Sequence, residues 1–193
     1  MKNEDQRLKQ GIEAFNSGEY EKSQEILGPL AEGGNEQAQT WLGFQYLNGL
    51  WVEKDPVAAR NLFLEAAAKG VDTAASNLGT IYEFGWGVEV DFAEAARWYR
   101  MAVDGGDPAA MNNLANLLIE GRGVEQDVEE AMRLLEQSAI AGHPAAWASL
   151  GSVYYSGLGG VPIEKKRAKE CYEQSWELGG PTDPATLDWS DVE

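Results

Sequence analysis

The sequence is poor in the residues that build most catalytic and metal centres. Among 193 residues, only Cys171 is a cysteine and only His143 is a histidine. A single cysteine excludes an internal disulfide framework and gives no sign of an oxidising compartment. One histidine and one cysteine are also too few for a zinc site, which uses three or four such ligands. A nucleophile pair of His143 and Cys171 would have no third group to orient it, so we expect no enzymatic activity.

Basic residues are scarce too. The chain has 15 lysines and arginines against 32 aspartates and glutamates, which gives a formal net charge of -17. Because nucleic-acid binding needs a surface rich in lysine and arginine, we expect no nucleic-acid ligand. The acidic surface favours solubility and a monomeric state. Attraction of a basic partner is the sharper alternative.

Long apolar runs and cofactor motifs are missing. Residues 1–10 are charged, which predicts no signal peptide, and the apolar stretches are too short to span a bilayer. We therefore expect a cytoplasmic protein without membrane contact. Glycine-rich turns occur, but no Gly-Lys-Ser or Gly-Lys-Thr follows them, so we expect no phosphate loop and no cofactor.

What the chain does have is a repeat of 36 residues. Several columns keep this step, and each column holds one residue type: Ala38, Ala74, Ala110 and Ala146; Leu42, Leu78, Leu114 and Leu150; Gly49, Gly85, Gly121 and Gly157. Later columns shift by one place in the last unit, which marks an inserted residue near Gly159 and Gly160. A period in this range is typical of a solenoid, whose units bury their apolar faces only against neighbours.

Each unit reads as helix, tight turn, helix. Ala74, Leu78 and Ile81 share one helical face, and Ala95 and Tyr99 share another. Glycine pairs mark the turn between the two helices, and an aspartate followed by proline, or by glutamate three residues later, marks the start of a helix. The pattern predicts an all-α fold.

The repeat resembles a known family. The second full unit contains the string Ala74-x-x-Asn77-Leu78-Gly79-x-x-Tyr82-x-x-Gly85-x-Gly87-Val88-x-x-Asp91-x-x-x-Ala95. This string is similar to the Sel1-like repeat, a subclass of the tetratricopeptide superfamily. The units depart from it at several positions: Trp41 and Ser149 replace the asparagine, Ala115 the glycine and Leu118 the tyrosine. The resemblance implies a right-handed α-solenoid of stacked helix-turn-helix hairpins, in a family that serves as scaffold or adaptor.

On this basis we expect one repeat array over residues 1–193. Residues 1–34 resemble an ordinary tetratricopeptide unit. Four Sel1-like units follow, at 35–70, 71–106, 107–142 and 143–179. Residues 180–193 are expected to hold a C-terminal capping helix, because Asp183-Pro184-Ala185 repeats the helix start at Asp107-Pro108-Ala109. This helix is predicted over 184–192, with Leu187 buried and Trp189 or Val192 packing beside it.

The resemblance also implies where a partner binds. In such arrays the first helix of each hairpin lines the concave side, which here would present polar and aromatic side chains to a protein or peptide. The expected concave-face residues are Phe44, Asn48, Thr80, Glu83, Asn112, Asn116, Glu120, Ser152 and Tyr155, with Gln37, Thr40 and Thr73 beside them. An alternative function is that of a neutralising or immunity-type regulator, which blocks a basic partner such as a toxin through its acidic surface.

Two further expectations concern tryptophans and charges. Trp51 and Trp86 lie in inter-helix turns and are possible anchors on the turn rim, whereas Trp41, Trp98, Trp147 and Trp176 are assigned to packing.

Cations at 165–167 begin the last long helix, where the helix dipole disfavours them. We expect inter-unit ion pairs between them and the acidic residues Asp127, Glu129, Glu130 and Glu136.

Overall fold

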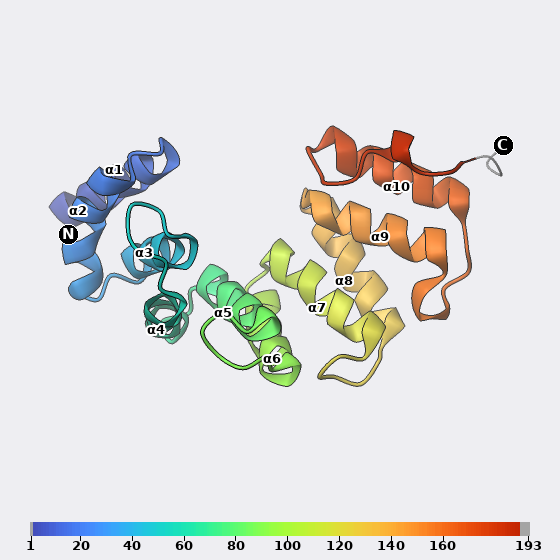
Figure 1. The fold of residues 1–193 in the computed structure, drawn as a ribbon, viewed down its shortest axis with the longest axis horizontal. Helices are drawn as coiled ribbons and strands as arrows, with labels where there is room; N and C mark the ends of the chain where they lie inside the picture. Colours follow the sequence, from blue (N-terminus) through green and yellow to red (C-terminus); the bar gives the residue numbers. More distant parts are fainter. Residues whose placement is uncertain (1, 190–193) are drawn as a thin grey trace. The chain divides into compact units, whose positions relative to one another are not determined.

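The computed structural model describes residues 2–189, and within this range the chain is helical and contains no strand (Figure 1). The elements are α1 (Lys2–Asn16), α2 (Tyr20–Glu32), α3 (Glu36–Asn48), α4 (Pro56–Ala67), α5 (Asp72–Phe84), α6 (Phe92–Asp104), α7 (Pro108–Glu120), α8 (Val128–Ile140), α9 (Pro144–Ser156), η1 (Leu158–Gly160), α10 (Lys165–Glu177) and η2 (Pro184–Thr186). No helix in the described range is long and apolar enough to cross a membrane.

The helices group into two compact units. Unit 1 runs to Asp91 and contains α1 to α5, and unit 2 starts at Phe92 and contains α6 to α10. Within each unit every helix packs against the next one along the chain, as the ribbon shows (Figure 1). First helices of adjacent hairpins also touch, α1 with α3 and α7 with α9. This sequential packing is that of stacked hairpins, as the repeat predicts.

The alanine and leucine columns form the core. The four alanines of the first helices and their second-helix counterparts are fully buried: Ala38, Ala74, Ala110 and Ala146, with Ala59, Ala95, Ala131 and Ala168. The leucine column from Leu42 to Leu150 is buried as well. Small side chains at these positions let helices approach closely, and the leucines fill the space that remains.

In α3 and in α9, a glycine faces a large ring on the second helix of the hairpin. A Cβ atom on Gly43 would lie 2.6 Å from the Phe63 ring, and one on Gly151 would lie 3.0 Å from the Tyr172 ring. The third Sel1-like unit departs from this pattern at both places together, because it has Ala115 where the others have glycine and Leu135 where they have an aromatic ring. Alanine is larger than glycine, and leucine is smaller than an aromatic residue. The two changes together therefore preserve the combined volume of the pair.

The turn glycines act as the sequence predicts. Gly49, Gly85, Gly121 and Gly157 end the first helices, all in the left-handed region, with φ between 66° and 71°. One backbone hydrogen bond then closes each turn: the amide of Asp55 donates to Tyr46, that of Asp127 to Leu118 and that of Glu164 to Tyr154. Left-handed backbone is nearly free of cost only for glycine, which explains the column.

Side-chain caps fix where helices begin. Asp55 Oδ1 accepts hydrogen bonds from the amides of Val57 and Ala58, and Asp107 and Asp127 each accept one from the amide three residues on. Second helices with a serine near the end are also tied to their own hairpins. Ser138 Oγ donates to the Pro108 carbonyl at 2.6 Å, and Ser175 Oγ to the Pro144 carbonyl at 2.9 Å. These bonds satisfy polar groups that the hairpin would otherwise bury without partners.

The inter-unit ion pair expected for α10 is present for Arg167. Arg167 Nη2 lies 3.7 Å from Glu136 Oε1 of α8, and the guanidinium carbon lies 4.3 Å from the centre of the Tyr154 ring. Lys165 instead places its amine 5.9 Å from the centre of the Tyr155 ring. The cations that start α10 therefore face both carboxylates and aromatic rings of neighbouring helices.

The expected C-terminal capping helix over 184–192 is wrong in its secondary structure. Only the three-residue η2 forms, capped by Asp183, and the backbone is extended at Leu187. The Trp189 indole N–H donates to the Pro184 carbonyl at 2.6 Å. In an α-helix that carbonyl would accept from residue 188, so the indole bond takes the place of a helical one. Val192 lies outside the described residues.

Leu187, expected to be buried, is only partly buried, and Trp189 makes the aromatic contacts of this segment. Its ring centre lies 5.6 Å from that of Tyr155 and 6.2 Å from that of Tyr172. Trp176, expected to pack, is 51% exposed, because no further hairpin follows α10 in the described residues. That the segment after α10 stabilises the array as a cap stays a prediction.

Core packing can be tested with one pair of substitutions in unit 2. Leu114→Ala removes a buried side chain and should lower the free energy of unfolding by about 2–5 kcal/mol, measured by urea denaturation. Ile140→Ala is the matched control, because Ile140 is 83% exposed and its truncation should change stability by less than about 0.5 kcal/mol. Equal effects of the two substitutions would contradict the assignment of the leucine column to the core.

The Arg167–Glu136 pair can be tested by charge reversal. Arg167→Glu should lower the Tm at low salt, by up to about 4 °C, since an exposed pair contributes about 0–1 kcal/mol. Adding Glu136→Arg to the same protein should recover part of the loss, and high salt should shrink the difference. A Tm that Arg167→Glu leaves unchanged at low salt would contradict this role.

Candidate functional site

First-helix residues of unit 1 line an open hollow. It has a volume of about 410 Å³, and its lining residues come from α3, α5 and the residue before α5: Gln37, Thr40, Trp41, Phe44, Val71 and Thr73. Four of these six belong to the residues that the resemblance places on the concave side. Hollows of about 300–1,000 Å³ are the usual size of binding sites in proteins.

Two aromatic rings, those of Trp41 and Phe44, line this hollow and belong to a longer row of rings. The ring centre of Trp41 lies 4.7 Å from that of Phe15 and 6.0 Å from that of Phe44, which in turn lies 5.8 Å from Phe63. Phe63 is fully buried, so the row is anchored in the core. Contacts of this kind hold the rings in place, which reduces the entropy lost when a partner packs against them.

Trp41 packs against the core as the sequence predicts, beside the buried cluster of Leu27, Leu30, Ala31, Ala38 and Leu42. It is only partly buried, however, and it also lines the hollow, together with Val71, which was not among the expected residues. A signal was available, because Trp41 stands where the other units have Asn77, Asn113 and Ser149. At this otherwise polar repeat position, Trp41 both packs on the core and lines the hollow.

The other expected concave-face residues are spread along the first helices of both units. Asn48 and Glu120 are exposed, and Thr80, Glu83 and Asn116 are partly buried. Asn48 Nδ2 donates to the Phe44 carbonyl, and Glu120 pairs with Arg122 at 2.5 Å. None of these five residues lines the hollow on α3 and α5.

The open placement expected for Asn112 is wrong. Asn112 is 6% exposed, its Oδ1 accepts a hydrogen bond from Ser149 Oγ at 2.8 Å, and its Nδ2 donates to Asn113 Oδ1 at 3.1 Å. Helical periodicity places Asn112 and Asn116 on one side of α7, but that side also faces α9. Asn112 therefore joins two neighbouring first helices.

At the other end of unit 2, the C-terminal segment covers part of the expected face. Ser152 is exposed, but Tyr155 is partly buried and contacts the Trp189 ring. The Trp189 ring therefore covers part of Tyr155.

The expected rim residues are exposed. Trp51 is 62% exposed and Trp86 37% exposed, and the Trp86 ring stacks on Phe84 with ring centres 5.5 Å apart and planes at 22°. Phe84, Val57 and Val90 are exposed in the same stretch of unit 1. The rim thus carries more apolar surface than the turns need for packing.

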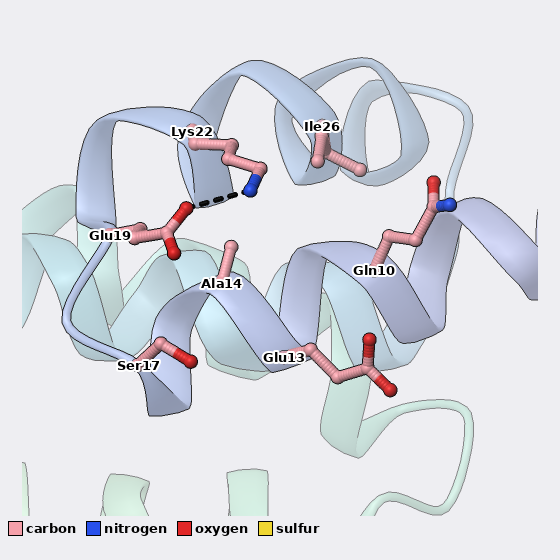
Figure 2. Close-up of a pocket in the computed structure, with 7 residues that line it drawn as sticks. All are labelled: Gln10, Glu13, Ala14, Ser17, Glu19, Lys22 and Ile26. Carbon is pink, nitrogen blue, oxygen red and sulfur yellow. Dashed lines mark hydrogen bonds and ion pairs between the residues drawn. The ribbon is translucent and has the colours of Figure 1, made fainter.

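A second hollow of about 420 Å³ lies between α1 and α2 (Figure 2). Its lining is mainly polar, and Figure 2 shows the Lys22 amine reaching the Glu19 carboxylate, 2.7 Å away. It contains no aromatic ring, so it offers less to an apolar partner group than the hollow on α3 and α5 does.

Cys171 lines a hollow with Glu136, Trp147 and Arg167, and His143 is not part of it. His143 is the N-cap of α9, and burial lowers the pKa of its imidazole, with Asp107 opposing that shift. Cys171 is buried in α10, where desolvation raises the pKa of its thiol to about 11. A thiol with such a pKa is almost fully protonated at neutral pH and is a poor nucleophile. No group of three potential metal ligands occurs in the described part of the chain.

The sequence of the repeats matches a family model. The model of the Sel1 repeat matches residues 36–71, 73–107, 108–143 and 145–180. The chain belongs to the Sel1 repeat family. The four matches agree with the repeat boundaries derived above to within one or two residues, and the expected relation to tetratricopeptide proteins is confirmed. Sel1 repeat proteins generally mediate protein–protein interactions.

Solved structures agree with this assignment. A Sel1 repeat protein from Oxalobacter formigenes is 32% identical, with a TM-score of 0.78 over 90% of this chain and 68% of that one. A protective antigen of uropathogenic Escherichia coli is 35% identical, with a TM-score of 0.71 over 81% of this chain and 33% of that one. A putative Sel1 repeat protein from Klebsiella pneumoniae is 26% identical, with a TM-score of 0.65 over 77% of this chain and 71% of that one. No curated protein matches the chain.

Alkylation kinetics can test the chemical state of Cys171. With a pKa of about 11, the native thiol reacts slowly with iodoacetamide at pH 8, because only about one molecule in a thousand carries the thiolate. In denaturant the thiol regains an ordinary pKa, and the rate should rise at least about a hundredfold. The measurement is the rate constant against pH. A native midpoint below 9 would contradict the environment described here.

Proposed function

We propose that this Sel1 repeat protein is a non-enzymatic binding module that holds a segment of another protein on its first-helix side. The observation that carries the proposal is the hollow of about 410 Å³ on α3 and α5, with its row of aromatic rings. We infer that it receives an apolar side chain of the bound segment. Scaffold proteins of this kind bind through surfaces and need no chemistry of their own.

Energetics support an apolar anchor. Interfaces gain most of their affinity from a few aromatic or aliphatic groups packed in dry, preformed pockets. Trp41 and Phe44 supply such a pocket wall, and their contacts with Phe15 and Phe63 hold it in position before binding. The free energy that ordering a flexible site would cost is thereby avoided.

Polar side chains at the edge suit a peptide backbone. Gln37 and Thr73 are exposed at the hollow, and both can donate and accept hydrogen bonds. On α5, Thr80 and Glu83 follow Thr73 along the first-helix side. We propose that these residues guide an extended segment past the apolar pocket, and that Asn48, Asn116, Glu120 and Ser152 play the same part on their own helices.

The alternative is neutralisation of a basic partner such as a toxin. Only the net charge of -17 supports it. Such a partner would be attracted over long range, and its association would slow steeply as salt is added. Binding through the apolar hollow would depend much less on salt, so the salt dependence of the association rate separates the two functions.

The hollow can be tested by filling it. After a partner has been recovered by affinity purification and mass spectrometry, Thr73→Tyr should weaken its binding at least about tenfold, or about 1.4 kcal/mol, because the new ring occupies the pocket. The affinity can be measured by isothermal titration calorimetry. Asn61→Tyr is the matched control, since Asn61 is exposed on α4, away from the hollow. Equal affinity of the Thr73→Tyr variant and the parent protein would place the site elsewhere.

A further inference from the structure

Trp51 breaks a glycine column of the repeat. The equivalent residues in the next three units are Gly87, Gly123 and Gly159, with φ of 71°, 68° and 69°. Trp51 has the same left-handed backbone, with φ of 67°, and no other described residue except glycine has a positive φ. The first Sel1-like unit thus keeps the conformation of the turn, but it has tryptophan in place of the glycine that fits this conformation.

Glycine is favoured at this position for two reasons. Left-handed backbone brings a Cβ atom too close to the carbonyl oxygen, which glycine avoids. The turn also lies against the start of the preceding second helix: a Cβ on Gly87 would lie 3.1 Å from Val57, and one on Gly159 would lie 2.8 Å from Val128. A residue that accepts this conformation is usually held there for a function.

Packing covers only part of Trp51. The residue is 62% exposed, so more than half of its surface stays in contact with water. It lines a hollow of about 400 Å³ over the turn that joins α1 and α2, together with Gly18, Glu19, Tyr20, Glu21 and Lys22. This hollow is separate from the one on α3 and α5, and the two share no lining residue.

The chemistry of the hollow at Trp51, which shares Glu19 and Lys22 with the hollow between α1 and α2, suits a cation. It combines an exposed indole with two carboxylates, Glu19 and Glu21, and a cation gains from both the ring face and the negative charges. The Lys22 amine lies 2.7 Å from the Glu19 carboxylate and offsets part of the negative charge of the hollow. Glu21 is exposed and has no ion-pair partner among the residues that the structure describes.

The other rim tryptophan has a cation nearby. The Lys54 amine lies 5.9 Å from the centre of the Trp86 ring. Trp51 has no such cation within residues 2–189. The face of the Trp51 indole is therefore open to a cation from a partner.

We propose that Trp51, Glu19 and Glu21 form a binding site for an arginine or lysine side chain of a protein partner. The aliphatic stem lies on the indole, and the charged head pairs with Glu21 and competes with Lys22 for Glu19. The site goes beyond the apolar pocket and does not depend on it, so Thr73→Tyr should leave it intact.

Peptide titration tests the chemistry of the site. The probe is the peptide Gly-Gly-Arg-Gly-Gly with blocked ends, and binding is followed by the backbone amide NMR signals of residues 18–21. We expect saturable shifts, with binding at least about fivefold tighter than that of the same peptide with norleucine in place of arginine. Equal binding of the two peptides, or no saturable shift with arginine, would overturn the proposal.

Variants test the residues. Trp51→Gly should abolish the shifts and raise the Tm, because glycine relieves the strained backbone. Lys22→Ala should tighten binding, because it frees Glu19, and Glu21→Gln should weaken it. Trp176→Ala, which removes an exposed tryptophan of α10, is the matched control and should leave binding unchanged. Retained binding in Trp51→Gly, or a lower Tm, would assign Trp51 a packing role and overturn the proposal.

Discussion

Close approach of the two helices of a hairpin is the constraint on which the rest of the structure depends. Gly43 against Phe63 leaves no room for a Cβ atom and Gly151 against Tyr172 leaves very little, so each pair limits how one helix can lie on the other. The buried alanine columns extend this fit along the helices. Ala115 and Leu135 show that the fit belongs to the pair and not to either residue, because both change together.

The turns follow from the same constraint. Helices that lie so close must be joined by a chain that reverses within a few residues, which requires left-handed backbone at positions such as Gly49 and Gly85. Each turn then packs against the start of the preceding second helix and leaves the opposite side of the turn open. Because only one side of the turn is packed, the rim is exposed. Its aromatic residues, Trp51 and Trp86 among them, lie on surface that the packing of the helices does not cover.

Repetition makes exceptions informative. Equivalent positions of a solenoid have the same packing environment and favour the same residue. A departure is therefore either compensated by a change in a neighbouring residue or related to a function other than packing of the repeat. Ala115 has such a neighbour. Trp41, at the asparagine position, packs on the core and also lines a hollow, and Trp51, at a glycine position, is exposed beside another. The proposed functional surfaces thus coincide with places where the repeat is broken.

By itself, the sequence determined the all-α repeat, its boundaries, the turn glycines, the aspartate caps and the core columns, because period and local backbone preference encode them. It did not determine which polar residues stay in water, since one side of α7 serves both the expected open face and α9, and Asn112 is buried there. Nor did it determine the form of the C-terminal segment, where the start signal at Asp183 gives only one turn. The Trp189 indole bonds to Pro184 and its ring packs on Tyr155. These outcomes depend on contacts between residues far apart in the chain, and only the tertiary structure decides them.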